Sequence, residues 1–261
     1  MKPKFQLNTF SITDIGQLPD NNEDNILCQT ADSKTAALLV VADGMGGHLA
    51  GEQASQLVVD TIANAMQKWL TTDQAHALAE PEAQIAESLQ TAVQQANVAI
   101  HDYSQKNLGE GARMGSTAAC AFIHQTTAII ANVGDSRVYL MRHGQLVRLT
   151  EDHSIVERFV QEGIIAEKDR YDSPVIHVVT RALGPSPNVD VDLFACDLIV
   201  GDRLLLCSDG LWEVLRGDEV IIRHLQSKDD LVTTGHNLIN AANQAGGKDN
   251  ISVILAELLP V

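Results

Sequence analysis

The chain has 261 residues, 45% of them hydrophobic and 20% charged, which is an ordinary composition for one large globular domain or two small ones. Its 18 Lys and Arg against 34 Asp and Glu give a formal net charge of −16, which argues against nucleic acid or an anionic membrane as the main partner. No apolar stretch approaches the length of a membrane span, and the first residues lack the apolar segment of a signal peptide, so the sequence predicts a cytoplasmic protein.

The predicted elements of the first half are strands at 5–13 and 36–42, a helix from Gly51 to Leu70, a loop at 71–81 and a second long helix that ends at Gly109-Glu110-Gly111. Apolar residues recur at spacings of three and four in both helices, as expected for helices that bury one face. The apolar face of the second helix is formed by Ile85, Leu89, Val93, Ala96 and Ile100.

The second half begins with short strands joined by tight turns. The predicted elements are strands at 117–124, 126–133, 136–142 and 145–149, a short helix from Ser154 to Glu162, irregular chain at 164–178, strands at about 189–195 and 203–208, helices at about 218–226 and 229–244, and a last strand at 251–258. His143-Gly144 indicates a hairpin turn. Strands and helices alternate in blocks, which favours an α+β fold of antiparallel sheets covered by helices over a doubly wound parallel sheet.

Two apolar runs end abruptly in Asp-Gly. Residues 38–42 close in Asp43-Gly44, and residues 204–207 close in Ser208-Asp209-Gly210. A short apolar run followed by a glycine turn is typical of a buried strand that reaches the edge of its sheet, where a ligand can enter. A third acidic position, Asp249-Asn250, lies just before the last predicted strand. Together these endings suggest carboxylates that converge on one cation.

The chemistry of such a site favours a hard cation. Mg²⁺ and Mn²⁺ prefer oxygen ligands, and a carboxylate shared by two ions leaves a water between them as a usable nucleophile near neutral pH. A single Asp-Gly is most often only a turn, but Asp43, Asp209 and Asp249 together favour a metal site. The four scattered cysteines form no Cys-x-x-Cys pair and are expected to be reduced core residues: Cys28, Cys120, Cys196 and Cys207.

Eight segments, in order along nearly the whole chain, resemble the metal-dependent Ser/Thr protein phosphatases of the type 2C family in their compact bacterial form. They are Asn22-Glu23-Asp24, Asp43-Gly44-Met45-Gly46-Gly47 with Gly51-Glu52, Gly115-Ser116-Thr117, Val133-Gly134-Asp135-Ser136-Arg137, Leu149-Thr150-Glu151-Asp152-His153-Ser154, Thr180-Arg181-Ala182-Leu183-Gly184, Cys207-Ser208-Asp209-Gly210-Leu211 and Gly247-Lys248-Asp249-Asn250-Ile251-Ser252. The resemblance implies two antiparallel sheets packed as a central sandwich and flanked on both sides by pairs of helices. It also implies a single catalytic domain over 1–261 with a flap-like segment at about 155–179.

The resemblance implies a role for each acidic position. Asp43 would bridge two Mn²⁺ or Mg²⁺ ions and hold the bridging water, and the Gly44 carbonyl would bind the second ion. Asp209 and Asp249 would hold the first ion, Glu23 would reach the second through water, and Asp135 would join Asp209 at a third, weaker metal position. The bridging water would attack phosphorus in line, without a phosphoenzyme.

Two positions depart from the family pattern. Pro19 stands where the family has an Arg that binds the substrate phosphate, so another cation, or the metals alone, must bind the phosphate in this chain. The candidate cations are Lys2, Lys4, Arg113 and Lys248. Met45 stands where animal relatives have a His proposed as general acid. His48 is a nearby candidate for that role, although a solvated loop histidine is the simpler interpretation and water on a metal is an alternative proton source.

Other residues of the matching segments have simpler structural explanations. Arg137 and Arg181 are expected to form ion pairs that hold loops, and Ser116-Thr117 to cap or turn the chain where it enters a strand. Asp152-His153-Ser154 is not a catalytic triad, because three adjacent residues cannot converge as nucleophile, base and orienting group. One of the three is expected to cap the following helix.

The resemblance therefore implies a phosphoserine and phosphothreonine phosphatase. Its expected substrates are phosphorylated proteins, the targets of a Ser/Thr kinase, and it is expected to be a monomer with no nucleic acid or membrane partner. An alternative, motivated by Pro19, is a catalytically weak binding module that retains the fold. A cysteine-dependent phosphatase is excluded, because the residues six positions after the cysteines are Lys34, Thr126, Asp202 and Glu213 rather than Arg.

Overall fold

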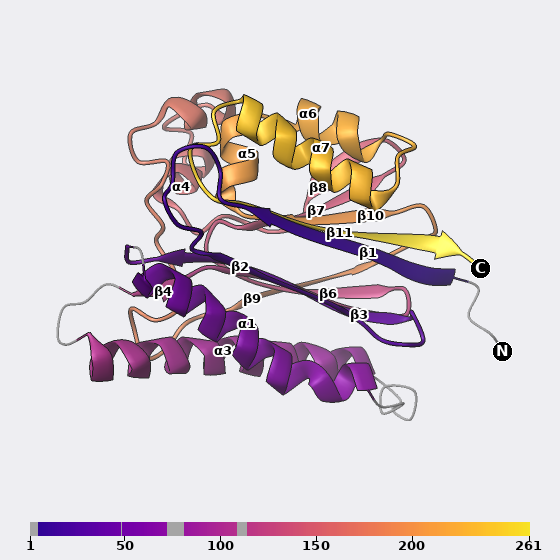
Figure 1. Ribbon diagram of the computed structural model, residues 1–261, viewed down its shortest axis with the longest axis horizontal. Helices are drawn as coiled ribbons and strands as arrows, with labels where there is room; N and C mark the ends of the chain where they lie inside the picture. Colours follow the sequence, from indigo (N-terminus) through magenta and orange to yellow (C-terminus); the bar gives the residue numbers. More distant parts are fainter. Residues whose placement is uncertain (1–4, 48, 72–80, 109–113) are drawn as a thin grey trace.

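A computed structural model describes residues 5–47, 49–71, 81–108 and 114–261. In this part of the chain, two antiparallel β-sheets lie face to face between two layers of helices (Figure 1). The predicted α+β sandwich is therefore confirmed. None of the helices in these ranges is long and apolar enough to span a membrane.

Both sheets are antiparallel at every pairing of their described strands. The five-stranded sheet has the order β1 (Phe5–Asp14), β11 (Ile251–Pro260), β10 (Arg203–Cys207), β7 (Arg137–Arg142) and β8 (Gln145–Arg148). The other sheet has the order β2 (Asp24–Thr30), β3 (Ala36–Met45), β5 (Ala118–His124), β6 (Thr127–Val133) and β9 (Asp192–Asp197), and the short β4 (Gly115–Ser116) pairs with the end of β3. His143 and Gly144 join β7 to β8 with φ of 51° and 82°, so the predicted hairpin turn is confirmed.

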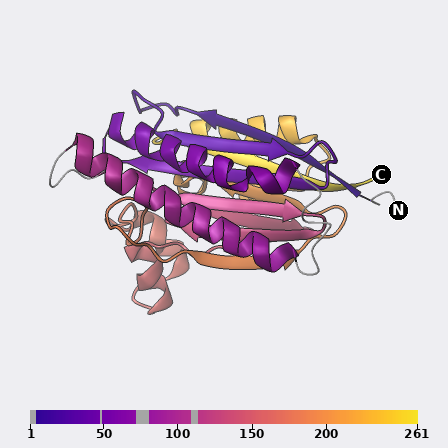
Figure 2. The same ribbon diagram turned by 90° about the horizontal axis from the view of Figure 1, so that it is seen from below.

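Helices cover the outer face of each sheet. The long helices α1 (Leu49–Thr71) and α3 (Pro81–Asn107) lie on the sheet that contains β3, and α5 (Asp209–Leu215), α6 (Asp218–Leu225) and α7 (Leu231–Gln244) lie on the sheet that contains β10. Between β8 and β9 the chain forms α4 (Ile155–Gln161) and a 3-10 helix, η1 (Glu167–Asp172), which project from one edge of the layers (Figure 2).

Alternating side chains of the central strands fill three apolar cores. In β3, Leu38 and Val40 point to the long helices, whereas Leu39 and Val41 point into the core between the sheets. In β10, the side chains of Leu204 and Leu206 enter that central core, and those of Leu205 and Cys207 pack under α5–α7. Because the central strands are buried on both faces, they read in the sequence as continuous apolar runs.

Four elements were missing from the sequence prediction, namely β2, β4, α5 and η1, and one strand was displaced. The strand β2 is half-exposed at the edge of its sheet, so it carries no continuous apolar run. The helix α5 begins at Asp209, where a glycine turn was predicted, and a carboxylate in the first turn is favourable for a helix. The strand predicted at 189–195 lies at Asp192–Asp197, and η1 lies in the stretch expected to be irregular. The end predicted for the second helix at 109–111 lies outside the described residues, as does most of the loop predicted at 71–81.

Candidate metal centre

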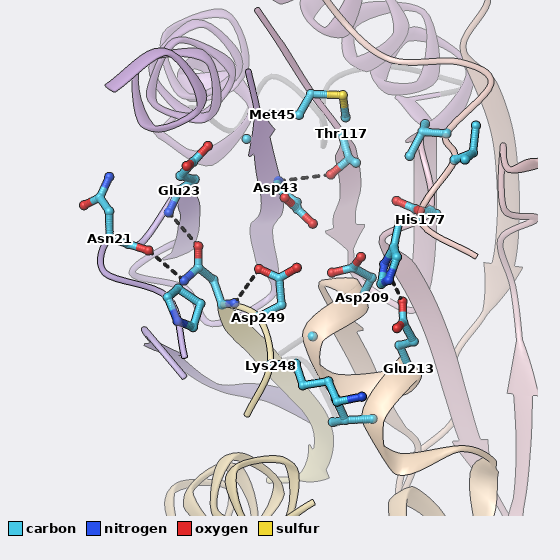
Figure 3. Close-up of a pocket in the computed structure, with 18 residues that line it drawn as sticks. Asn21, Glu23, Asp43, Met45, Thr117, His177, Asp209, Glu213, Lys248 and Asp249 are labelled. Carbon is cyan, nitrogen blue, oxygen red and sulfur yellow. Dashed lines mark hydrogen bonds and ion pairs between the residues drawn. The ribbon is translucent and has the colours of Figure 1, made fainter. Parts of the chain in front are cut away.

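One end of the sandwich is hollowed into a pocket of about 750 Å³. Four acidic side chains that the sequence singled out line it: Glu23, Asp43, Asp209 and Asp249. The carboxylates of Asp43, Asp209 and Asp249 point toward a common space from different elements (Figure 3). Asp135, the fifth predicted carboxylate, follows β6 and lies on the wall of the same pocket.

Antiparallel pairing explains why these positions meet. In an antiparallel pair the end of one strand lies beside the start of the next. The register places Asp43, near the end of β3, opposite Asp24, the first residue of β2. In the other sheet, Cys207 at the end of β10 lies opposite Val253, near the start of β11. Each sheet therefore places two acidic segments at the same end of the sandwich.

The glycines after Asp43 and Asp209 allow close packing of the backbone around the pocket. A Cβ on Gly44 would overlap the backbone of Gly51, and a Cβ on Gly210 would overlap the carbonyl oxygen of Asn250. A glycine at each of these positions therefore lets a backbone carbonyl approach closely.

Hydrogen bonds from neighbouring strands and loops fix the acidic segments. The Asp43 N–H donates to Thr117 Oγ1 over 3.0 Å, and that hydroxyl contacts Ser136 Oγ at 2.8 Å. The Asn250 side chain accepts from the Glu23 N–H over 2.7 Å and donates to two backbone carbonyls, those of Ile15 and Asn21, over 2.9 Å each. The pocket is therefore held by polar groups that themselves have partners.

The carboxylates of this region lie in an unfavourable electrostatic environment. Burial, opposed by hydrogen bonds from hydroxyl groups and reinforced by other carboxylates, raises the pKa of Asp24 to about 7. Burial and the nearby Asp152 carboxylate raise the pKa of Asp135 to about 7 as well. Burial and mutual repulsion hold the pKa values of Asp43 and Asp209 well above their usual range. The buried Oδ1 of Asp209 has no hydrogen-bond partner in the described part of the chain.

Positive charge is scarce in the pocket. Among its described lining residues, Lys248 is the only Lys or Arg. Pro19 and Met45 line the pocket, so the two departures from the family pattern lie at the site. Three of the four candidate cations, Lys2, Lys4 and Arg113, lie outside the described residues, and so does His48.

Comparison with known proteins assigns the chain to a family. The family model described as "Protein phosphatase 2C" matches residues 19–256. The chain belongs to the protein phosphatase 2C family. It is therefore a protein phosphatase, and its catalysis is metal-dependent.

Named relatives and solved structures agree with this assignment. The chain is similar to "Serine/threonine phosphatase stp" of Listeria monocytogenes serotype 4b, with 39% identity over 246 residues, 94% of this chain and 93% of the relative. The crystal structure of Stp1 from Staphylococcus aureus matches with a TM-score of 0.85 and 33% identity, over 98% of this chain and 97% of that chain. The catalytic domain of PstP in complex with two manganese ions matches with a TM-score of 0.82 and 33% identity, over 98% and 99% of the two chains.

The phosphatase pocket also contains two residues that the sequence did not reveal. His177 and Glu213 lie beside Asp209, and one potential ligand atom from each of the three lies within 4.8 Å of the others. His177 Nδ1 is 3.1 Å from Glu213 Oε2. His177 lies in a stretch without periodicity and Glu213 in the helix that was not predicted, so no local pattern indicated either residue.

The arginines of the phosphatase motifs form the expected ion pairs. Arg137 donates from Nε to Asp152 Oδ1 over 2.8 Å, and Arg181 pairs with Asp192. The Ser154 hydroxyl accepts from the Glu157 N–H and caps α4, so the capping interpretation of 152–154 is confirmed. Thr117 lies where the chain enters β5, as expected, and its hydroxyl also supports the Asp43 backbone.

The cysteines are free thiols, as predicted. Cys120 and Cys207 are buried in the apolar cores, and Cys28 and Cys196 are half-buried. Burial raises the pKa of Cys120 to about 12, so this thiol is protonated and unreactive at neutral pH.

Proposed function

We propose that this chain removes phosphate from serine and threonine side chains of proteins, with divalent cations bound in the acidic pocket. The observation that carries the proposal is the convergence of Asp43, Asp209 and Asp249 from two different sheets. Membership of the protein phosphatase 2C family and the similarity to named serine/threonine phosphatases support the same function.

The donor atoms of the pocket suit a hard divalent cation. Its described acidic groups are Glu23, Asp43, Asp135, Asp209, Glu213 and Asp249, and they face a single lysine. Buried carboxylates without partners are costly unless a cation neutralises them, and Asp209 Oδ1 is such an atom. Oxygen donors of this kind match Mg²⁺ and Mn²⁺.

The ligand roles follow from the resemblance and from the positions of the side chains. Asp43, Asp209 and Asp249 would hold two cations, with the Gly44 carbonyl and, through water, Glu23 as further ligands. Asp135 and Asp209 would hold a third. The bound cations would supply an activated water as nucleophile and would neutralise the phosphate charge.

The remaining residues of the site orient groups and shape access. Thr117 and Asn250 hold the backbones of Asp43 and Glu23, which fixes the directions of two carboxylates. Apolar side chains also line the pocket: Pro19, Met45, Val178, Val179 and Val214. Met45 has no proton to donate, so the candidates for the general acid are still His48 and water on a bound metal.

Lys248 is the proposed partner of the substrate phosphate. It is the candidate cation that lines the described pocket, and a charge-assisted hydrogen bond to phosphate contributes about 1.5–3 kcal/mol. The alternative of a catalytically weak module rests on the absence of an arginine at Pro19 and predicts that phosphopeptide binds without turnover.

The decisive experiment measures metal dependence and turnover together. Purified enzyme is freed of metal with a chelator, and hydrolysis of an aryl phosphate and a phosphothreonine peptide is followed as Mn²⁺ or Mg²⁺ is added. We expect activity to appear with metal, and the melting temperature to rise, because binding at 100 times Kd stabilises a fold by about 2.7 kcal/mol. Full activity in excess chelator would refute the metal mechanism, and peptide binding without hydrolysis would favour the weak module.

The biological setting is part of the proposal. Residues 1–261 would act as a single catalytic domain and a monomer in the cytoplasm, on the phosphorylated targets of a Ser/Thr kinase. The segment 155–179 would act as a flap, because it projects from the layers while its last residues, His177–Val179, line the pocket.

A further inference from the structure

Arg170, in η1, is a fully buried arginine in a segment that projects from the body of the protein. Its side chain has a relative exposure of 0%. A buried guanidinium is costly unless charged partners surround it. Even so, its Nε has no hydrogen-bond partner within the described residues. A segment that served only as a surface loop would have no use for such a side chain.

Three acidic side chains from three places surround this guanidinium. Nη1 donates to Glu167 Oε1 of η1 over 2.8 Å, and Nη2 donates to Glu157 of α4. Nη2 also lies 4.0 Å from Asp152 Oδ2, in the loop before α4. Arg170 therefore fastens η1 to α4 and to the start of the segment 155–179.

Two further arginines complete a charge-balanced group, here called the arginine cluster: Arg137, Arg148, Arg170, Asp152, Glu157 and Glu167. Arg148 of β8 donates to Glu157 Oε1 over 2.9 Å, and Arg137 of β7 donates to Asp152. The three positive and three negative groups compensate one another. The cluster thus joins the projecting segment to two strands of the sandwich.

The other side of the cluster reaches the acidic pocket. The Arg137 guanidinium carbon lies 3.4 Å from the centroid of the Trp212 ring. Trp212 Nε1 donates over 3.1 Å to the carbonyl oxygen of Asp135. Trp212 belongs to α5, the helix that begins with Asp209. The arginine cluster therefore contacts the elements that carry two of the pocket carboxylates.

The wall of the pocket is attached to the same few residues as Arg170. The Ile155 N–H donates to the Val178 carbonyl over 2.9 Å, and the Thr180 N–H donates to the His153 carbonyl over 2.7 Å. Val178 and Val179 line the pocket. Glu157, two residues after Ile155, is the partner of Arg170. The backbone at 153–157 therefore connects the buried arginine to the pocket wall.

We propose that Arg170 is a positioning residue that sets how phosphoprotein substrates bind. By clamping Glu157, it holds the segment 155–179 in the arrangement in which Val178 and Val179 wall the pocket. The inference rests on the proposed phosphatase function and names a residue outside the pocket that tunes it. A peptide chain must pass this wall, whereas a small aryl phosphate reaches the acidic floor with little contact to it.

The apolar packing of the segment makes the proposal testable by substitution. Val156 and Ile176 are buried in the core under α5–α7, so the segment is anchored without Arg170. Arg170→Met removes the charge and the hydrogen bonds, while Arg170→Lys keeps the charge and loses the forked geometry. Arg158→Met is the matched control, because Arg158 lies on α4 with its side chain 62% exposed, and its one ion pair among the described residues is with the exposed Glu162.

The experiment compares the two substrates in each variant, with metal present. In Arg170→Met we expect KM for a phosphothreonine peptide to rise about tenfold, and kcat and the KM for an aryl phosphate to change less than about twofold. The peptide KM of Arg170→Lys should lie between the values for Arg170→Met and wild type. This variant also provides the test if the methionine variant does not fold. Arg158→Met should match wild type.

Hydrogen exchange supplies a readout that does not depend on turnover. The Thr180 amide should exchange about tenfold faster in Arg170→Met than in wild type, because Thr180 directly follows the segment that Arg170 holds in place, whereas its acceptor, the His153 carbonyl, belongs to a residue fixed by Gly134. Equal changes for both substrates, or a lower melting temperature with an unchanged peptide KM and unchanged exchange, would overturn the proposal. A wild-type enzyme that hydrolyses neither substrate would refute the proposed function, and exchange at Thr180 would still decide the role of Arg170.

Discussion

The protein buries carboxylates in two neighbouring regions, and the two regions compensate their charge in opposite ways. In the arginine cluster, Asp152 and Glu157 face three arginines, and although burial raises the pKa of Glu157, hydrogen bonds from Arg148 and Arg170 lower it overall. In the pocket, Asp43, Asp135 and Asp209 have only Lys248 as a described cationic neighbour in the lining, and their pKa values are raised.

The difference separates a structural ion cluster from a binding site. A compensated cluster adds rigidity at little net cost in free energy, whereas uncompensated carboxylates destabilise the fold until a cation binds. Nothing in the burial alone distinguishes the two, because Asp135 at 2% and Asp152 at 3% exposure are equally hidden. The two regions differ in the number of positively charged side chains that lie beside their carboxylates.

The largest expected effect is on catalysis, on the pocket side of the comparison. Asp209→Asn removes a charged ligand with little change in volume, and we expect kcat for an aryl phosphate with Mn²⁺ to fall by about ten-thousandfold. The control is Asp20→Asn, an exposed position that does not line the described pocket, which should stay within about twofold of wild type. Retention of a tenth of wild-type activity in Asp209→Asn would mean that this carboxylate is not a ligand.

The second largest expected effect is a loss of stability when the arginine cluster is disrupted. Asp152→Asn leaves Arg137 with an uncompensated buried charge, so we expect the free energy of unfolding to fall by about 3–5 kcal/mol. The measurement is denaturant unfolding in the presence of metal. Glu162→Gln breaks only an exposed pair and should cost less than about 0.5 kcal/mol. If the two variants lost equal stability, the cluster would be no more than a surface ion pair.

The two regions should also respond to pH in opposite directions. Asp24 has a pKa raised from 3.8 to about 7, so its contribution to stability is fully present below pH 3.8 and is lost as the pH rises through about 7. Glu157 has a lowered pKa, so its contribution is present above its usual 4.5 and is lost as the pH falls through the folded value.

Metal-free protein reveals the effect of Asp24. In chelator, Asp24 alone should lower the free energy of unfolding by about 3 kcal/mol between pH 5 and pH 8. Asp24→Asn removes this titrating group and should make the slope shallower by that amount, and the other carboxylates with raised pKa values, Asp43, Asp135 and Asp209, keep the remainder. A slope that is the same in the variant and in wild type would show that Asp24 is not the group that titrates.

The sequence predicted the pocket better than the cluster for a physical reason. Asp43 and Asp209 follow apolar strands within a few residues, and antiparallel pairing then brings the strand ends together, so local patterns were sufficient. His177, Glu213 and Arg170 owe their roles to contacts between distant segments, which leave no periodic trace.

The fold shows the same division between local and distant signals. The central strands and long helices were predicted from buried faces, whereas β2 and α5 were missed. The strand β2 lies half-exposed at an edge, and α5 has only seven residues. Short or half-exposed elements depend on tertiary packing more than on their own composition.

The smallest expected effect concerns Lys248, the one Lys or Arg among the described residues that line the pocket. Lys248→Ala should raise KM for a phosphothreonine peptide about fivefold and leave kcat within about twofold, because a cation that binds the ground state and the transition state equally changes affinity alone. Pro19→Arg adds a cation at another wall of the pocket and should restore KM in the Lys248→Ala background. If Lys248→Ala left KM unchanged and Pro19→Arg lowered it, Lys248 would not bind the phosphate. The contrast with the arginine cluster would then be sharper, because the one lysine among the described lining residues would make no contribution to substrate binding.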